Sequence, residues 1–115
     1  MKKTHFIFLC GALLMSLVAG CAIGQMGAMS RAHAGLADKR YEFTLKRLAE
    51  AEQFDQTTPE LQAEISYMRA ECYDGLSESA EAVGMYRYVV ETYPKSEFAF
   101  MAREKLAASG HGERP

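Results

Sequence analysis

Apolar residues return every three or four positions through most of the chain, which is the spacing of one face of a helix. A first helix is expected from Asp38, a capping residue, to Phe54. Thr58 and Pro59 then give a hydroxyl cap and a first-turn proline, and Gly75 is the expected stop. The inward stripes predicted for these two helices are Tyr41, Leu45, Leu48 and Glu52, followed by Leu61, Ile65, Met68, Cys72, Tyr73 and Leu76.

Two more helices follow by the same criteria. Ser77 or Ser79 is expected to open a helix that Pro94 ends, and Ser96 to cap a last helix reaching about Ala108. The predicted inward positions are Ala82, Val83, Tyr86, Val89, Val90 and Tyr93, then Ala99, Ala102 and Leu106. Because no stretch alternates with a period of two, the sequence predicts an all-α domain.

The first twenty residues have a different pattern. Lys2 and Lys3 precede an apolar run from Phe6 to Ala19, which is shorter than the roughly 20 residues that cross a hydrocarbon core. This layout is typical of a secretory signal. The end of this run and the two residues after it, Leu17-Val18-Ala19-Gly20-Cys21, resemble the lipobox of bacterial lipoproteins. The resemblance implies removal of residues 1–20 and a diacylglycerol thioether on Cys21; ordinary cleavage with a free Cys21 is the alternative.

Lipidation would place the protein in the cell envelope. The residue after Cys21 is Ala22 rather than an aspartate. By the same resemblance, this favours transport of the lipoprotein to the outer membrane, where it would face the periplasm. Residues 21–30 contain no charge and two glycines, so we expect a lipidated, flexible tether with a reach of about 15–18 Å. The predicted helical domain covers residues 31–108, and residues 109–115 are a predicted flexible tail.

The charge and the cysteine content of the chain argue against nucleic acid as a partner and against a disulfide within the domain. Thirteen basic and fifteen acidic residues give a net charge of −2. The chain thus lacks the excess of basic residues that is typical of proteins that bind nucleic acid. Loss of residues 1–20 leaves 11 basic and 15 acidic residues. Cys10 leaves with the signal and Cys21 is consumed by lipid, so Cys72 has no intramolecular partner and is predicted to be a small buried hydrophobe.

The spacing Ala-x2-Tyr-x8-Ala-x3-Tyr-x2-Val-x4-Pro begins at Ala70. It resembles the tetratricopeptide repeat (TPR), a 34-residue pair of antiparallel helices. The resemblance implies one good repeat over roughly residues 63–96, a weaker one over 27–58 and a C-terminal capping helix, as in envelope-assembly lipoproteins. Ser66 and Arg69 depart from the pattern, and an unrelated helical hairpin is the alternative. The residues expected to pack the repeat are Ala70, Tyr73, Ala82, Tyr86, Val89 and Pro94.

Catalytic and metal-binding motifs are missing from the sequence. His5 leaves with the signal, His33 stands alone and His111 lies in the tail. The chain has no His-x-x-x-His, Cys-x-x-Cys, phosphate-cradling glycine loop or Gly-x-Ser-x-Gly. We therefore expect no enzyme, no metal, no cofactor beyond the lipid on Cys21, and no small-molecule substrate.

Recognition is the better candidate. In TPR domains the first helix of each pair lines a concave groove that holds a peptide or a helix. The resemblance assigns to this groove Glu64, Tyr67, Glu71 and Asp74, with His33 from the earlier unit and Phe98, Met101 and Lys105 from the last helix. An acidic groove with an aromatic floor suits a basic or amphipathic segment; a solvated face with Tyr67 packed locally is the alternative.

The last predicted helix has more large apolar residues than one face can hold. Phe98, Phe100 and Met101 cannot all point inward with Ala99 and Ala102, so part of this helix is expected to form a contact surface. The sequence thus predicts a membrane-anchored, non-catalytic TPR-like adaptor that binds another envelope protein of an assembly, secretion or pilus type complex. A self-associating structural lipoprotein is the alternative.

Overall fold

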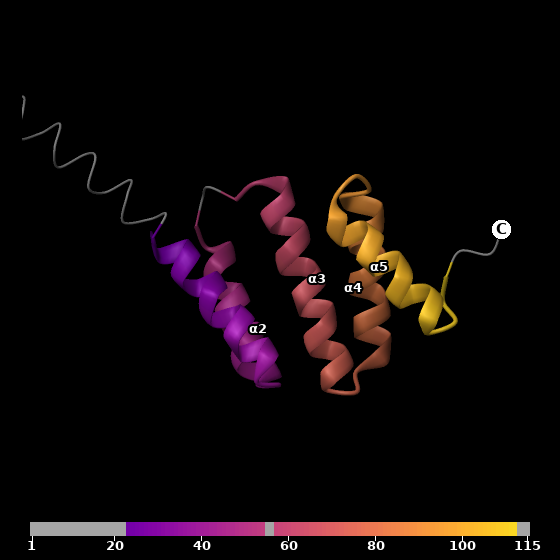
Figure 1. Cartoon of the computed structure of the whole chain (residues 1–115), viewed down its shortest axis with the longest axis horizontal. Coiled ribbons are helices and arrows are strands. Elements are labelled where there is room, and N and C mark those ends of the chain that lie inside the picture. Colours follow the sequence, from indigo (N-terminus) through magenta and orange to yellow (C-terminus); the bar gives the residue numbers. More distant parts are fainter. Residues whose placement is uncertain (1–22, 55–56, 113–115) are drawn as a thin grey trace, which may run out of the picture.

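A computed structural model describes residues 23–54 and 57–112, and these are helical apart from short turns (Figure 1). An N-terminal helix is described over residues 23–37. It is followed by α2 (Tyr41–Glu52), α3 (Pro59–Gly75), α4 (Ser79–Thr92) and α5 (Glu97–Ala108). These ranges contain no strand, and the predicted all-α class is confirmed.

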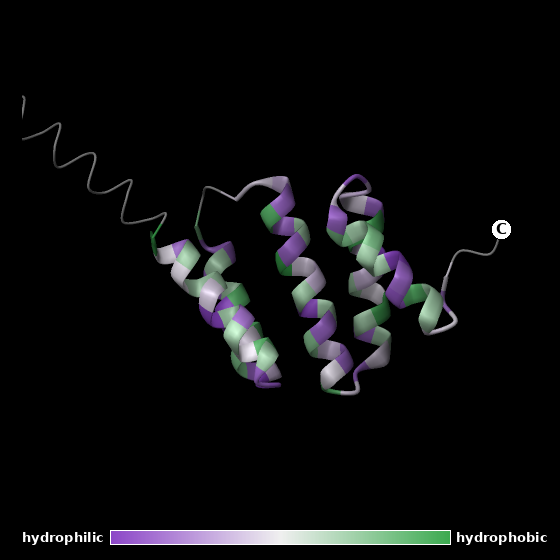
Figure 2. Ribbon diagram, viewed as in Figure 1, coloured by the Kyte–Doolittle hydropathy of each residue, from purple (hydrophilic) through white to green (hydrophobic). Residues whose placement is uncertain are grey.

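Consecutive helices run in opposite directions and lie side by side (Figure 1). Helix α3 packs against α2, α4 and α5, and α5 also packs against α4. Hydrophobic and hydrophilic residues are interspersed along every helix (Figure 2), as expected for helices that bury one face each. Helix α3 lies near the middle of this antiparallel array, and α5 crosses over α4 and also reaches α3.

Two clusters of buried side chains hold the helices together. The alanines at the helix contacts are buried, and their small side chains let the backbones approach closely. The first cluster joins the N-terminal helix, α2 and α3 through Ala28, Met29, Ala32, Leu48, Ala51, Ile65 and Met68. The second joins α3, α4 and α5 through Tyr67, Ala70, Ala82, Tyr86, Val89, Ala99, Ala102 and Leu106.

Two of the predicted helix caps are present. The Leu61 N–H donates to the Thr58 hydroxyl at 3.1 Å, and the Ala99 N–H donates to the Ser96 hydroxyl at the same distance. Each hydroxyl satisfies one of the amide groups that a helix start leaves without an internal partner. Pro94 lies in the turn after α4, which ends near it as predicted.

Helix α4 begins at Ser79, one of its two predicted starts, whereas the predicted cap of α2 is wrong. Helix α2 begins at Tyr41 after Arg40, so Asp38 lies in the preceding turn, where its side chain cannot reach the first free amides. The N-cap position of α4 is Glu78, without a side-chain cap. Ser77 instead takes a positive φ of 60° in the turn, a conformation that closes the turn and leaves its hydroxyl outside the cap position.

Helix α3 ends at Gly75 as predicted, but for a different reason. The left-handed residue of this turn is Ser77 rather than Gly75. A side chain at Gly75 would overlap the ring of Tyr41, so this glycine serves the close approach of α2 to the end of α3.

The inward face of α2 is rotated from the predicted stripe. Thr44, Leu48 and Ala51 are buried, whereas Tyr41 and Leu45 are half-buried and Glu52 is exposed. Thr44 can occupy this position because its hydroxyl donates to the Arg40 carbonyl at 2.9 Å. The polar atom is satisfied locally, which removes most of the penalty for burying it.

The prediction of a flexible tether over residues 21–30 is wrong for residues 23–30, which belong to the N-terminal helix. Ala28 and Met29 are buried, and the Gln25 side-chain amide donates to the Ala51 carbonyl at 3.3 Å. Small residues allow this packing: the Phe54 ring lies against Gly24. Residues 1–22, with the signal sequence, the lipobox and Cys21, lie outside the described residues, as do residues 113–115 of the predicted tail.

Candidate functional site

A cavity of about 440 Å³ opens where the turn after the N-terminal helix meets the C-terminal half of α3 and α5. It brings together three residues that the sequence assigned to a groove, Glu71, Asp74 and Lys105. The full lining is Leu36, Ala37, Lys39, Tyr41, Glu71, Asp74, Gly75 and Lys105. Its walls therefore combine apolar side chains with charges of both signs.

Glu71 is half-buried at this cavity. Burial raises the pKa of its carboxyl above the ordinary value, Lys105 opposes this shift, and Asp74 adds to it. The ion pairs among the described residues do not involve Glu71. A carboxylate that is partly desolvated without a direct cationic partner is unfavourable for folding.

Asp74 is fixed in place by a neighbouring helix. The Tyr86 hydroxyl of α4 donates to Asp74 Oδ2 at 2.8 Å. Burial, together with this hydrogen bond, raises the pKa of Tyr86, so the tyrosine remains a neutral donor. The packing residue of α4 thus also orients a carboxylate of the cavity.

Glu64 lies further toward the start of α3 and is already engaged. Its Oε1 is 2.8 Å from Nε2 of His33, which joins the N-terminal helix to α3. Both residues belong to the face that the sequence predicted for the groove, but neither lines the cavity. Their contact supports the relative position of the two helices.

Tyr67 does not form the expected exposed aromatic floor. It is 3% exposed, and its ring centroid lies 5.6 Å from that of Tyr86 and 5.8 Å from that of Phe98. Burial raises its pKa to about 12. The aromatic and apolar surface of the cavity comes instead from Tyr41 and Leu36. Sequence reasoning placed Tyr41 on an internal stripe and did not single out Leu36.

The three large apolar residues of α5 separate. Phe98 is half-buried against the core, and Met101, at 41% exposed, shares a face with Lys105 by its four-residue spacing. Phe100 is 70% exposed and points away from that face, with the Arg103 guanidinium 5.7 Å from its ring centroid. They therefore do not form one contact surface.

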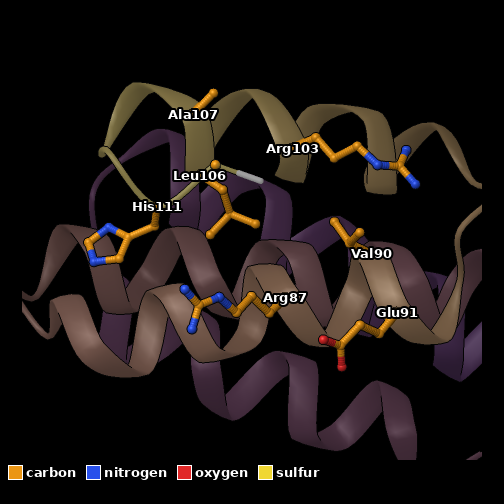
Figure 3. A pocket seen from close by; sticks show the side chains of 8 residues that line it. Arg87, Val90, Glu91, Arg103, Leu106, Ala107 and His111 are labelled. Atoms are coloured by element: carbon orange, nitrogen blue, oxygen red, sulfur yellow. The ribbon is translucent and has the colours of Figure 1, made fainter. Parts of the chain in front are cut away.

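A second cavity of about 340 Å³ lies between α4 and α5 (Figure 3). Arg87, Val90 and Glu91 of α4 face Arg103 and Leu106 of α5 across it, and His111 is at one end. His111 Nδ1 is 3.0 Å from the Ser109 carbonyl. None of the residues predicted to bind a partner lines this cavity.

The described residues contain no group of three His, Cys, Asp or Glu side chains placed to hold a metal ion. None of their helices has the length and apolarity needed to cross a membrane. Cys72 is free and buried as predicted. Burial raises the pKa of its thiol to about 11, which keeps it protonated and weakly nucleophilic near neutral pH.

No protein-family model, curated protein or solved structure matches this chain. The fold and the chemistry of its own residues are therefore the basis for a functional proposal.

Proposed function

We propose that this protein is a lipid-anchored, non-catalytic adaptor of the bacterial cell envelope that binds a basic or amphipathic segment of another envelope protein. The observation that carries the proposal is Glu71, a half-buried carboxylate without an ion-pair partner among the described residues, at the wall of an open cavity. A lysine or arginine of a partner would add a direct ion pair to the attraction that Lys105 already exerts on Glu71. The half-buried Leu36 and Tyr41 would contact the apolar side of the same segment.

The proposed architecture is a short TPR-like array closed by α5. Several contacts support it: Ala70 and Ala82 are both fully buried between α3 and α4, and Val89 is buried beside them. Tyr73 is half-buried against the same cluster. In a TPR array the first helix of a pair contacts its own second helix and the first helix of the next pair, and α3 contacts α4 and α5.

The proposed anchor is a lipid on Cys21, after removal of residues 1–20, with the protein in the outer membrane facing the periplasm. Its support is the apolar run and the Leu17–Cys21 sequence. More than one acyl chain gives stable attachment, because each buried methylene contributes about 0.8 kcal/mol.

The second candidate is a self-associating envelope lipoprotein. It is favoured by Phe100, which is 70% exposed and lies on the side of α5 away from the charged cavity. Light scattering on the full chain extracted in detergent separates the two candidates. An adaptor is a monomer by itself, whereas the second candidate is a dimer or larger.

Co-purification tests the adaptor directly. The tagged full-length protein is extracted from its native membrane in mild detergent, as wild type, Glu71→Lys or Glu91→Lys. Glu91 is the matched control because it is an exposed acid that lines the other cavity. We expect the same partner to be retained by wild type and Glu91→Lys and to be lost with Glu71→Lys. Equal retention by all three would contradict binding in the Glu71 cavity.

A further inference from the structure

Two large apolar side chains are exposed near the start of the N-terminal helix. Ile23 is 70% exposed and Met26 is 73% exposed. Their three-residue separation puts them on one face of the helix. The opposite face is buried against α2 and α3 through Ala28 and Ala32. The first turns of this helix are therefore apolar on both sides, although only one side has a partner among the described residues.

The exposed side is also uncharged. Residues 22–30 contain no Asp, Glu, Lys or Arg, and the first charged residue after them is Arg31. At 1.5 Å per residue, Arg31 lies about 12 Å along the helix axis from Ile23. Helices that bind at a bilayer surface bury their apolar side about 5–10 Å deep, at the boundary of headgroups and acyl chains. Ile23 and Met26 can reach this depth without dehydrating a charge.

Covalent geometry limits the distance between this helix and the anchor. Ile23 follows Cys21 by two residues, and an extended chain spans at most about 3.6 Å per residue, so their Cα atoms lie within about 7 Å. A lipid on Cys21 would thus bring the bilayer to the first helical turn. The helix is in turn bound to α2 through Gln25 and Ala51, so the whole array would share that position.

We propose that Ile23 and Met26 dock into the lipid surface that holds the anchor, so that the helical array is seated directly on the bilayer rather than on a flexible tether. This inference rests on the proposed lipidation of Cys21. It commits to a lipid bilayer as the occupant, because the uncharged segment continues directly from the anchor.

The seated position has a consequence for the proposed binding cavity. The N-terminal helix runs away from Ile23 toward the turn that lines the cavity (Figure 1). Leu36, at the cavity wall, is thirteen residues along the helix, which corresponds to about 20 Å. With the helix axis inclined to the bilayer, the cavity lies up to about this distance from the docked side chains, where a protein segment can enter it from the aqueous side.

Fluorescence quenching by lipid tests the docking. Met26→Cys and, separately, Phe100→Cys are introduced into the full-length protein, which is processed in cells, purified and labelled with an environment-sensitive dye. Phe100 is the matched control because its exposure, 70%, is close to the 73% of Met26. Protein without either substitution measures background labelling. Each sample is reconstituted in phosphatidylethanolamine–phosphatidylglycerol vesicles with or without brominated acyl chains, and intact mass reports the lipid on Cys21.

With the lipid present, we expect the dye at position 26 to shift to shorter wavelength and lose most of its emission to the brominated lipid. The dye at position 100 should keep its emission. Lipidated protein with neither position quenched would overturn the seating while leaving the proposed function intact, as would dimer formation that protects position 26 in detergent. Equal quenching at both positions also overturns it. A mature chain without lipid on Cys21 overturns the proposed anchor, and the seating with it.

Discussion

The glycines of this protein differ in the space around them, so replacing each by alanine is expected to change the stability in different directions. A Cβ at Gly35 would lie 2.5 Å from Thr44 Oγ1 and 2.9 Å from Phe43 Cδ1, and Thr44 is fully buried. We expect Gly35→Ala to lower the free energy of unfolding by about 1–3 kcal/mol, because the N-terminal helix and α2 would have to separate.

Gly84 is the control for this experiment. It lies within α4 and a Cβ there would meet nothing within 4 Å, so Gly84→Ala should raise the free energy of unfolding by about 0.5–1 kcal/mol. Thermal or urea unfolding of the full chain in detergent measures both. A stabilising Gly35→Ala would mean that the two helices are not in close contact.

The raised pKa of Tyr67 predicts that the free energy of unfolding falls as the pH rises above 10. Its pKa is about 12 in the folded protein against an ordinary 10.0, so between these values the unfolded chain binds fewer protons than the folded one. Protonated Tyr67 therefore makes its full contribution to the free energy of unfolding below pH 10. This contribution, on the order of 2 kcal/mol, is lost as the pH rises toward 12.

Tyr67→Phe should therefore show a shallower loss of stability between pH 10 and 12 than wild type. The remaining loss comes from Cys72, Tyr86 and Tyr93, whose pKa values are also raised by burial. Identical alkaline unfolding of wild type and Tyr67→Phe would show that the Tyr67 hydroxyl is solvated.

At the scale of helices, the sequence predicted most of α3, α4 and α5. Thr58 and Ser96 cap helices by accepting hydrogen bonds from amides three residues later, and Pro94 ends a helix by its own ring geometry. Each can therefore be recognised from the neighbouring sequence alone. Apolar spacing was also sufficient for Ala82, Tyr86 and Val89, which are buried. These features depend on nearest neighbours in the chain.

The N-terminal helix could not be predicted in this way. An uncharged segment with Gly24 and Gly27 has weak helix propensity, and its helical structure depends on α2. The missed signal is the set of small residues at four-residue spacing, Gly24, Ala28 and Ala32, which suits a close helix contact. The candidate cavity was predicted only in part. Leu36 and Tyr41 line it from the two sides of a turn, and the sequence near each residue does not determine how that turn folds.

The two phenylalanines of α5 belong to different environments, and this predicts different effects of replacing them. Phe98 packs against the buried ring of Tyr67, so Phe98→Ser should lower the free energy of unfolding by about 2 kcal/mol. Phe100→Ser should change it by less than about 0.5 kcal/mol.

Circular dichroism during thermal unfolding distinguishes them, and light scattering on the same samples reports association. A stable Phe100→Ser protein that loses self-association would favour the self-associating lipoprotein over the adaptor. Equal destabilisation by both changes would mean that Phe100 is also buried, in contradiction to the structure.

At the scale of the whole molecule, both the proposed function and the seating on the bilayer depend on the lipid anchor at Cys21. We expect Cys21→Ser to leave the signal uncleaved or to release the protein from the membrane fraction, because serine cannot form the thioether to diacylglycerol. Fractionation followed by intact mass measurement checks both outcomes. Cys72→Ser serves as the control and should remain lipidated and in the membrane. A normally processed, membrane-bound Cys21→Ser protein would exclude the lipoprotein interpretation.

The central claim is that the cavity between the N-terminal helix, α3 and α5 binds another envelope protein. Site-specific photo-crosslinking in intact cells tests it most directly, with the photoreactive amino acid at Ala37, an exposed residue of the cavity wall, or at Tyr88 on α4 as the control. The account predicts one adduct from position 37, none from position 88, and loss of the adduct when Glu71→Lys is added. An adduct from position 37 that persists with Glu71→Lys, or one whose mass is twice that of the chain, would contradict it.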